Sequence, residues 1–446
     1  MVEQESHHLF QFYTVVDMKD NSRTFLSYSR KDGFDFARDL RQKLEKLGLS
    51  LWQDIISLEG GRDFWLQITE ALDHVEFMVL VRTDGAMQSP IVRKEWRYAR
   101  QQGVCVYPVK GEPFSKEIHQ SLPRWMRNAQ YYDFDIEEQW QKFVSALHKS
   151  CETVRVPFMV EDKPDDFVER PEEFNQLLAL LLDPKREEPI AITAALRGAG
   201  GYGKTTLAKA LCHDERIQNA FDDGVLWVTL GENPGDLTGR VEDLIYTLSG
   251  ERPGFSSVQA AAARLAELLA DRDILLVIDD VWNSAHLTPF LQGGVRCSRL
   301  ITTRNSDTLP AKAKGINLDA MRPEEATSLL GFNLPEGESS GLQSLAQRLG
   351  EWPLLLKLVN ATLGYRVHDL QQSFAAAIAY VNAALDECSL VAFDQDNATE
   401  RHQAVAKTLG VSLQMLDEGA LRVCVRWGKC WRSWRGNEKG RYDLFE

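Results

Sequence analysis

Short apolar runs alternate with longer amphipathic stretches along the first third of the chain. Between residues 22 and 150 this pattern predicts strands at TFLSYS (24–29), LSLWQD (49–54), EFMVLV (76–81) and VCVYPV (104–109). Apolar positions at helical spacing predict helices at 34–48 and 64–75, and we expect another helix in the opening segment. Such alternation predicts a parallel sheet with helices on both faces.

A second alternating region follows a break. Prolines and a run of acidic residues at 151–166 predict a linker. In the region 167–320 the pattern predicts strands at 189–196, 224–230, 273–280 and 298–304. Helical spacing dominates from 321 to 395, and 396–446 ends in an irregular tail rich in Trp and Arg. The expected fold class is therefore α/β, with two parallel-sheet domains and a small helical subdomain.

Composition narrows the class of protein. The 446 residues are 44% hydrophobic and 26% charged, as in ordinary globular proteins of several domains. The formal net charge of -14 argues against nucleic acid or an anionic membrane as a bulk partner. No apolar run approaches the ~18 residues that a membrane span needs. The acidic start lacks the layout of a signal peptide, so we expect a cytoplasmic protein.

The seven cysteines are scattered, and none stands in C-x-x-C spacing. This usage is typical of a reducing compartment. We expect neither a disulfide framework nor a zinc site.

The strongest motif follows the strand expected at 189–196. Gly198, Gly203, Lys204 and Thr205 match G-x-x-x-x-G-K-[ST] between a predicted strand and a predicted helix. Glycines let backbone N–H groups surround a phosphate, and the helix adds its positive end. We expect Lys204 to contact the β- and γ-phosphates and Thr205 to ligate Mg²⁺. The further nucleotide contacts expected from this loop are Gly200, Gly201 and Thr206. The alternative is a chance glycine turn.

Two later strands end in charged residues that suit the same site. DILLVIDD ends in Asp279 and Asp280, which we expect to hold Mg²⁺. Taken alone, such a pair is often only a turn. SRLITTR ends in Arg304, where a cation would sense the terminal phosphate. The alternative there is a solvated arginine at a strand end.

Together GAGGYGKTTLA, LLVIDDVW, SRLITTR and GEWPLLLKLV resemble the NB-ARC class of signal-transducing P-loop ATPases. The resemblance implies ATP or ADP with Mg²⁺, slow hydrolysis, and a switch from a closed ADP state to an oligomerising ATP state. It places Val168 and Arg170, within FVERPEEFNQLLALL, against the adenine. Pro353 falls at the family's Gly-Leu-Pro-Leu position, from which GEWPLLL departs at the second residue.

One similar motif is not assigned to the nucleotide. Val367, His368 and Asp369 are similar to the family's Met-His-Asp sensor, but they follow Pro353 too closely and fall inside the helical subdomain. We interpret His368 as a cap or loop residue. Residues 396–446 look like the start of a winged-helix domain that gives way to the basic tail, which we expect to be poorly ordered.

A single carboxylate stands within the basic stretch SPIVRKEWRYA (89–99). On a helix the neighbours of Glu95 are Ile91, Val92, Tyr98 and Ala99, so helical spacing provides no salt-bridge partner. A carboxylate on an apolar stripe is costly unless something outside the helix uses it. Glu95 is therefore a candidate catalytic residue, and a structural helix residue is the alternative.

TFLSYSRKD, LWQDIISLEGGRDFWLQI and SPIVRKEWRYA resemble, in order and spacing, the Toll/interleukin-1 receptor (TIR) domain over residues 22–150. The resemblance implies a flavodoxin-like parallel sheet and, in enzymatic members, cleavage of the nicotinamide–ribose bond of NAD⁺ by a glutamate that aligns with Glu95. Tyr28, Arg30 and Asp54 lie on strand-end loops, where we expect them to bind NAD⁺. The alternatives are a core tyrosine, a solvated arginine and a turn aspartate. Ile91 stands where some active members carry a tryptophan.

These features predict a signalling or defence protein, in which ATP-dependent homo-oligomerisation brings TIR domains together for NAD⁺ hydrolysis. The alternative is a non-enzymatic adaptor that recruits other TIR domains under the same ADP/ATP switch. We expect no nucleic acid and no membrane among the partners.

Overall fold

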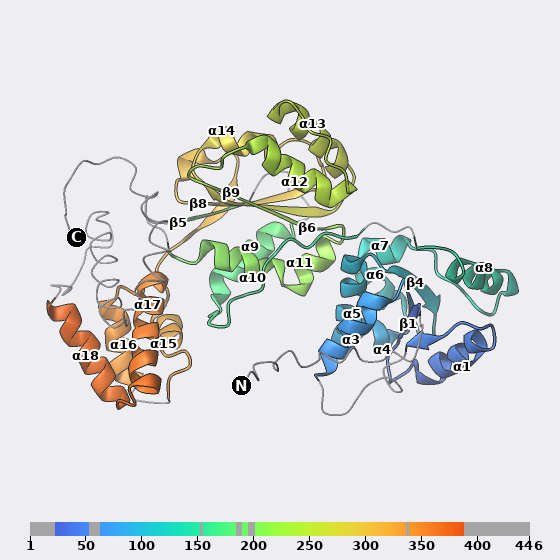
Figure 1. Cartoon of the computed structure of the whole chain (residues 1–446), viewed down its shortest axis with the longest axis horizontal. Coiled ribbons are helices and arrows are strands. Elements are labelled where there is room, and N and C mark those ends of the chain that lie inside the picture. Colours follow the sequence, from blue (N-terminus) through green and yellow to red (C-terminus); the bar gives the residue numbers. More distant parts are fainter. Residues whose placement is uncertain are drawn as a thin grey trace, which may run out of the picture. The chain divides into compact units, whose positions relative to one another are not determined.

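The computed structural model describes residues 23–52, 63–151, 155–183, 190–194, 201–335 and 339–387. The chain divides into two compact units. The first is formed mainly by residues up to Phe158, and the second by most of the chain from Met159 onward (Figure 1). The expected helix in the opening segment and the C-terminal region 396–446 lie outside the described residues.

The first unit is built on a parallel sheet. Its strands run in the order β2 (Leu51–Trp52), β1 (Thr24–Ser27), β3 (Phe77–Arg82) and β4 (Cys105–Lys110), and each neighbouring pair is parallel. Strand order that reverses around β1 is the doubly wound, flavodoxin-like arrangement. The predicted fold class is therefore confirmed for this unit.

Side chains that alternate along β3 supply two cores, one on each face of this sheet. Met78 and Leu80 join one apolar cluster, and Phe77, Val79 and Val81 join the other. Such burial on both faces explains why the strands read as continuous apolar runs. The helices of this unit are α1 (Phe34–Glu45), α3 (Phe64–His74), α4 (Asp84–Gln88), α5 (Pro90–Gln102), α6 (Lys116–Ser121), α7 (Arg124–Asn128) and α8 (Glu137–Leu147).

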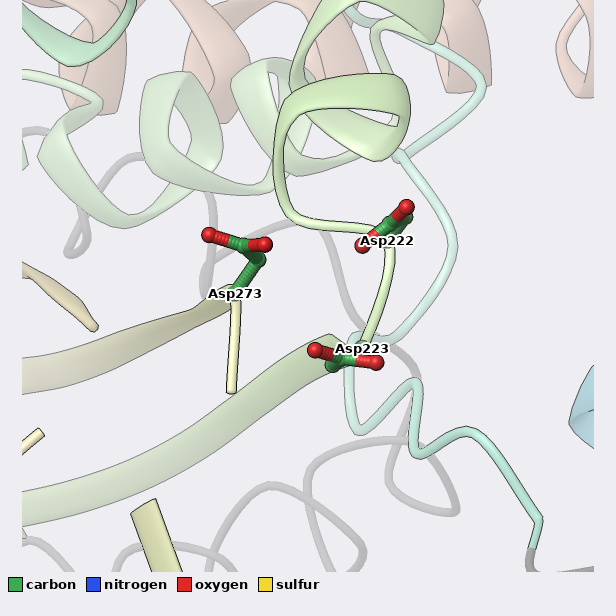
Figure 2. Close-up of side chains that lie close together, drawn as sticks. All are labelled: Asp222, Asp223 and Asp273. Atoms are coloured by element: carbon green, nitrogen blue, oxygen red, sulfur yellow. The ribbon is translucent and has the colours of Figure 1, made fainter. Parts of the chain in front are cut away.

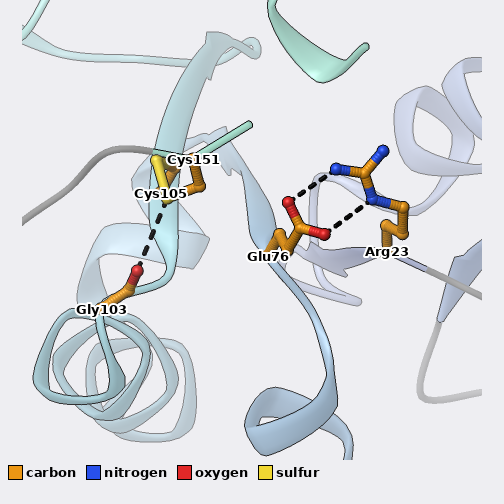
Figure 3. The surroundings of a disulfide bond; sticks show 5 residues. All are labelled: Arg23, Glu76, Gly103, Cys105 and Cys151. Atoms are coloured by element: carbon orange, nitrogen blue, oxygen red, sulfur yellow. Dashed lines mark hydrogen bonds and ion pairs between the residues drawn. A yellow bond between two sulfur atoms is a disulfide. The ribbon is translucent and has the colours of Figure 1, made fainter. Parts of the chain in front are cut away.

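The first unit also contains a disulfide between Cys105, at the start of β4, and Cys151, shortly after α8 (Figure 3). The sulfur of Cys151 lies 3.5 Å from the carbonyl oxygen of Gly103. Our expectation of cysteines without disulfides was wrong for this pair. The two residues are 46 positions apart, so no local spacing signals that α8 returns the chain to the edge of β4.

A charge pair lies near this disulfide, just before two neighbouring strands. Arg23 Nε and Nη2 donate to the two carboxylate oxygens of Glu76 over 2.9 and 2.6 Å (Figure 3). The hydrogen bond from Arg23 lowers the pKa of the Glu76 carboxyl. Because both side chains are about half exposed, we expect this pair to contribute little to stability.

The second unit contains a five-stranded sheet in the order β6 (Gly224–Gly231), β7 (Ile274–Val281), β8 (Ser298–Thr303), β5 (Ile190–Ala194) and β9 (Lys314–Leu318). β5 pairs in parallel with β8 and β9, and β7 pairs in parallel with β8. In Figure 1, α13 (Val258–Leu269) and α14 (Ser284–Leu287) cover one face, and α9 (Pro171–Leu181) and α10 (Lys204–Cys212) cover the other.

Four of the five strands match the predicted apolar runs, whereas β9 was missed. Its sequence is KGINL, with two exposed residues at its start, and only the last residue is fully buried. An edge strand buries few side chains, so its apolar signal is weak. The remaining elements around this sheet are α11 (Glu215–Ala220), α12 (Leu237–Ser249), η1 (Thr288–Phe290) and η2 (Ser306–Thr308).

In the described residues after the second sheet, every element is helical, as the sequence predicts. They are α15 (Pro323–Leu330), α16 (Ser339–Arg348), α17 (Pro353–Gly364), the π-helical turn η3 (Tyr365–Asp369) and α18 (Phe374–Glu387). Within the described ranges, no helix combines the length and the apolar composition that a membrane crossing requires.

Candidate functional site

The phosphate-loop motif leads directly into α10. Gly201 and Gly203 adopt φ values of 86° and 91°, which side chains with a β carbon rarely adopt. Gly203 is the residue before the first helical residue, Lys204, and Thr205 and Thr206 form the rest of the first turn. Gly198 and Gly200 lie outside the described residues. The described half of the loop therefore has the tight, glycine-dependent turn that the motif predicts.

The Lys204 side chain is nearly buried at the start of α10, with 8% of the residue exposed. Burial lowers the pKa of Lys204 to about 8, aided by the nearby Arg304 and opposed by the carboxylates of Asp280 and Asp279. A desolvated ammonium is destabilised in its charged form. A phosphate group beside Lys204 would relieve that cost.

Thr205 and Asp279 meet although they are far apart in the sequence. Thr205 Oγ1 donates to Asp279 Oδ1 over 2.8 Å, and Thr302 Oγ1 donates to the same oxygen over 2.7 Å. Thr229 Oγ1 lies 3.4 Å from the other carboxylate oxygen. A hydroxyl and a carboxylate side by side are the ligand types that Mg²⁺ takes in phosphate-loop proteins. The arrangement fits Mg²⁺ at Thr205 and Asp279.

Asp280 and Arg304 form the second charged pair of this site. Arg304 Nε lies 3.4 Å from Asp280 Oδ1, and both side chains are partly buried. Asp280 adopts φ 54°, and its N–H donates to Thr302 Oγ1. The guanidinium of Arg304 also lies 4.8 Å from the ring centre of Trp282. The structure thus brings Lys204, Thr205, Asp279, Asp280 and Arg304 together at one edge of the sheet.

The sequence analysis missed the threonines that orient Asp279. Thr302 and Thr229 lie on β8 and β6, two strands on either side of β7. The one available signal was a hydroxyl side chain inside an otherwise apolar run, SRLITTR or GVLWVTL. Buried hydroxyls need partners, but sequence alone does not name the partner.

Arg170 connects the segment before α9 with the phosphate loop. The residue is 5% exposed, and its Nη1 donates to the carbonyl oxygens of Tyr202 and Asp319 over 3.3 and 3.1 Å. Its Nη2 donates to Glu173 over 2.8 Å. Val168, two residues earlier, is partly buried. These guanidinium contacts all go to the protein itself, so contact of either residue with adenine stays a prediction.

The segment around Pro353 packs on the phosphate loop. Pro353 is buried at the first position of α17. The ring of Trp352 stacks on that of Tyr202 with 5.8 Å between centres. A β carbon added at Gly201 would lie 2.6 Å from Leu354 Cβ. The small helical subdomain and the phosphate loop are therefore in direct contact.

His368 lies in the π-helical turn η3, where its Nε2 is 2.9 Å from the carbonyl oxygen of Asn333. Asn333 belongs to the turn after α15. His368 therefore lies within a helical turn, so our interpretation of it as a cap or loop residue was wrong.

In the first unit, Glu95 lies on the buried face of α5 beside Val92, Trp96 and Ala99. The residue is 6% exposed, and Ser27 Oγ donates to Glu95 Oε2 over 2.6 Å. Ser27 is the last residue of β1, so the carboxylate lies at the carboxyl end of that strand. Ligands of open parallel sheets bind at this edge.

The other residues expected to bind NAD⁺ lie near that edge or outside the described ranges. Tyr28 is buried in the core, directly after β1, and Arg30 is exposed on the loop that follows. Asp54 lies outside the described residues. The sequence analysis missed Asp32, which accepts hydrogen bonds from Thr83 Oγ1 over 2.7 Å and from a backbone N–H after β3 over 2.6 Å. Asp32 thereby fixes the loop that carries Arg30.

Three carboxylates cluster at the amino-terminal ends of β6 and β7, whereas Asp279 lies near the carboxyl end of β7. Figure 2 shows Asp222 and Asp223 before β6 and Asp273 before β7, with one oxygen of each within 4.8 Å of the others. Asp273 forms an ion pair with Arg296. An acidic cluster of this kind is not by itself a metal site, and we assign none here.

Family profiles match two parts of the chain. The profile of the TIR domain matches residues 24–148, and the profile of the NB-ARC domain matches residues 172–334. The NB-ARC match includes GAGGYGKTTLA, LLVIDDVW and SRLITTR, whereas GEWPLLLKLV lies beyond it.

Several curated proteins are similar to part of the chain. Regulatory protein AfsR of Streptomyces coelicolor is 30% identical over 208 residues, which cover 44% of this chain and 20% of the relative. Apoptotic protease-activating factor 1 of Danio rerio is 27% identical over 322 residues, which cover 65% of this chain and 24% of the relative. Putative disease resistance protein RGA4 of Solanum bulbocastanum is 35% identical over 113 residues, 24% of this chain and 11% of the relative. The chain thus spans about a quarter or less of these relatives' length.

Two solved structures align with parts of this chain. The TIR domain of a Toll-related receptor from Hydra magnipapillata aligns with 29% of this chain and 99% of its own, at 16% identity and a TM-score of 0.25. A STAND protein with a tetratricopeptide repeat sensor from Pyrococcus horikoshii aligns with 57% of this chain and 41% of its own, at 16% identity and a TM-score of 0.34. From the two profile matches and the two parallel sheets, we conclude that this chain joins a TIR domain to an NB-ARC domain.

Proposed function

We propose that this protein is a nucleotide-switched signalling or defence protein whose TIR domain hydrolyses NAD⁺. In this proposal the NB-ARC domain binds ADP or ATP with Mg²⁺, and the ATP state assembles copies of the chain. The names of the relatives, an apoptotic protease-activating factor and disease resistance proteins, agree with such a role.

The nucleotide half of the proposal rests on Lys204, Thr205 and Asp279. Lys204 would neutralise phosphate charge, and the Thr205 hydroxyl and Asp279 carboxylate would hold Mg²⁺. Mg²⁺ supplies charge that stabilises the phosphate oxygens. Asp280 pairs with the cation of Arg304 instead of standing free as a general base, and this pairing favours slow hydrolysis.

The switch rests on contacts that the helical subdomain makes within the second unit. Lys357 Nζ, on α17, lies 2.7 Å from Asp166 Oδ1, and Arg322 forms an ion pair with Glu172. With the stacking of Trp352 on Tyr202, these contacts close the subdomain over the phosphate loop. A nucleotide that changes the conformation of the phosphate loop would strengthen or weaken these contacts. ADP and ATP could then favour different positions of the subdomain, as a switch requires.

The NAD⁺ half rests on one observation, the Glu95 carboxylate held by Ser27 at the carboxyl end of β1. Departure of nicotinamide takes the bonding electron pair to the ring nitrogen and leaves oxocarbenium character at the ribose. The carboxylate of Glu95 would stabilise that positive charge. Water then bonds to the anomeric carbon and gives up a proton, with ADP-ribose as product.

The test of this half uses the full chain with a chemically induced oligomerisation tag, and measures release of nicotinamide. We expect clustering to start NAD⁺ consumption and Glu95→Gln to lower the rate by about two to three orders of magnitude. Glu137→Gln, at an exposed position in the first turn of α8, is the matched control and should leave the rate unchanged. Undiminished consumption by Glu95→Gln would refute the assignment.

The competing function is a non-enzymatic adaptor, and the 6% exposure of Glu95 is the observation that favours it. An adaptor would keep NAD⁺ intact on clustering while its TIR domains still associate. Light scattering on the same samples measures that association. Equal assembly of the wild type and Glu95→Gln, with no nicotinamide release from either, establishes the adaptor.

A further inference from the structure

A pocket of the TIR domain is lined by residues other than Glu95. It has a volume of about 520 Å³ and is lined by Arg82, Lys110, Gly111, Glu112, Pro113, Phe114, Ser115, Lys116, His119 and Tyr131. Arg82 is the last residue of β3 and Lys110 is the last residue of β4, so the pocket opens at the carboxyl ends of these two strands. Its volume is in the range of small-molecule sites, about 300–1,000 Å³.

Arg82 is the most unusual group in this pocket. The residue is only 3% exposed, and its buried Nε has no hydrogen-bond partner among the described residues. Burial lowers the pKa of the Arg82 guanidinium, and the nearby Tyr131 side chain opposes that shift. A buried guanidinium normally pairs with an anion. Within the described part of the chain, the protein supplies none.

The contacts that Arg82 does make are weak substitutes for an anion. Its guanidinium carbon lies 4.5 Å from the ring centre of Phe114 and 5.0 Å from that of Tyr131. Its Nη2 is 3.3 Å from His119 Nδ1, which must accept because arginine only donates. Two aromatic rings and one imidazole hold the guanidinium in place, yet they leave Nε and the positive charge for a ligand.

The charge of the lining favours an anion. Three of the lining residues are cationic, Arg82, Lys110 and Lys116, and one is acidic, Glu112. Lys110 forms an ion pair with Asp133, with 2.8 Å between Nζ and Oδ2, so the Asp133 carboxylate already neutralises most of its positive charge. Lys116 is exposed at the start of α6, on the lining of the pocket. Arg82, which is buried, and Lys116, which is exposed, are therefore the two cations of the lining that could bind an anion.

We propose that this pocket binds the phosphate group of a small phosphorylated metabolite, with Arg82 as its buried anchor and Lys116 at the entrance. A phosphate presents several acceptor oxygens and up to two charges, which suits one guanidinium donor plus one ammonium. The pocket is much larger than a phosphate ion, so an organic part of the ligand would lie against the half-exposed Tyr131 ring. This inference does not depend on the proposed NAD⁺ hydrolysis, because Glu95 does not line the pocket.

The experiment titrates inorganic pyrophosphate into the full chain by calorimetry. All samples carry Lys204→Ala, so that the phosphate loop does not contribute. We expect one site per chain, weakened at least about tenfold by Arg82→Gln, since a hydrogen bond to a charged group is lost. Arg127→Gln, at an exposed arginine on α7, is the matched control and should bind like the parent.

Further samples keep the test decisive. If Arg82→Gln fails to fold by circular dichroism, the exposed Lys116→Glu decides, because reversing a rim charge should also weaken pyrophosphate binding without disturbing the core. Citrate, which carries carboxylates only, should bind more weakly than pyrophosphate. Absence of pyrophosphate binding, binding that survives Lys116→Glu and Arg82→Gln, or a preference for citrate would each overturn the proposal.

Discussion

Binding of ADP should weaken as the pH rises through about 8, because Lys204 loses its proton in the free protein. The pKa of Lys204 is lowered from 10.5 to about 8, chiefly by burial. A bound phosphate favours the charged ammonium and raises that pKa again. Binding above pH 8 therefore takes up a proton, and proton uptake on binding means that affinity falls with rising pH.

The size of the effect follows from the lowered pKa of Lys204. With a free-state pKa of about 8, nearly all Lys204 is charged at pH 7 and about a tenth is charged at pH 9. The affinity for Mg²⁺–ADP should therefore fall about tenfold between these values, or about 1.4 kcal/mol. An ordinary lysine with a pKa of about 10.4 would produce almost no change over the same range.

A fluorescent ADP analogue, titrated at several pH values with constant salt and Mg²⁺, measures this slope. Lys204→Arg is the matched variant, since a guanidinium stays charged throughout and should give a nearly flat profile. The readout is the slope and not the absolute affinity, so a weaker but flat Lys204→Arg profile still agrees with the reasoning. A flat wild-type profile, or the same slope in both proteins, would refute it.

Three further predictions concern other parts of the molecule. Cys151→Ser removes the disulfide between residues 46 positions apart, and loss of this cross-link should lower the free energy of unfolding by up to about 4 kcal/mol. Denaturant titration of the variant, compared with the wild type with and without reductant, measures this loss. Gly201→Ala puts a β carbon 2.6 Å from the Leu354 β carbon of α17, and it should weaken ADP binding and lower the melting temperature. Gly231→Ala is the control, because Gly231 also has positive φ but open space around it, so this variant should show the backbone strain alone. Equal losses in the two variants would contradict the steric argument. Ser27→Ala removes the donor to the buried Glu95 and should destabilise the TIR domain by about 1.5–3 kcal/mol while lowering nicotinamide release, and an unchanged stability would show that the hydrogen bond is unimportant.

Local patterns were sufficient for the chemistry that lies within one contiguous stretch. The glycine spacing before Lys204 predicted a tight turn leading into a helix, and Gly203 at φ 91° directly before α10 has that form. The i±3 and i±4 neighbours of Glu95 predicted an apolar face, and Val92 and Ala99 are buried with it, whereas Ile91 is 47% exposed. Backbone period and turn geometry act over a few residues, so sequence reports them directly.

The partners of those groups depended on the tertiary fold. Strand β8 inserts between β5 and β7, and so it brings the Thr302 hydroxyl to Asp279, a contact across 23 positions of sequence. Ser27 reaches Glu95 across 68 positions, because α5 packs over the end of β1. Nothing in the local pattern around either hydroxyl names its acceptor, since a single serine or threonine in an apolar run suits many partners.

The same limit explains the disulfide of Cys105 and the buried Arg82. Each was an unremarked residue of an apolar strand, and its character came from elements that arrive much later in the chain, at Cys151 and at Tyr131. Sequence thus predicted most of the strands, the two family resemblances and the residues that carry charge at strand ends. Closure of the two sheets decided which of those charges are desolvated, which are paired, and which face a pocket, because desolvation and pairing are properties of three-dimensional neighbours.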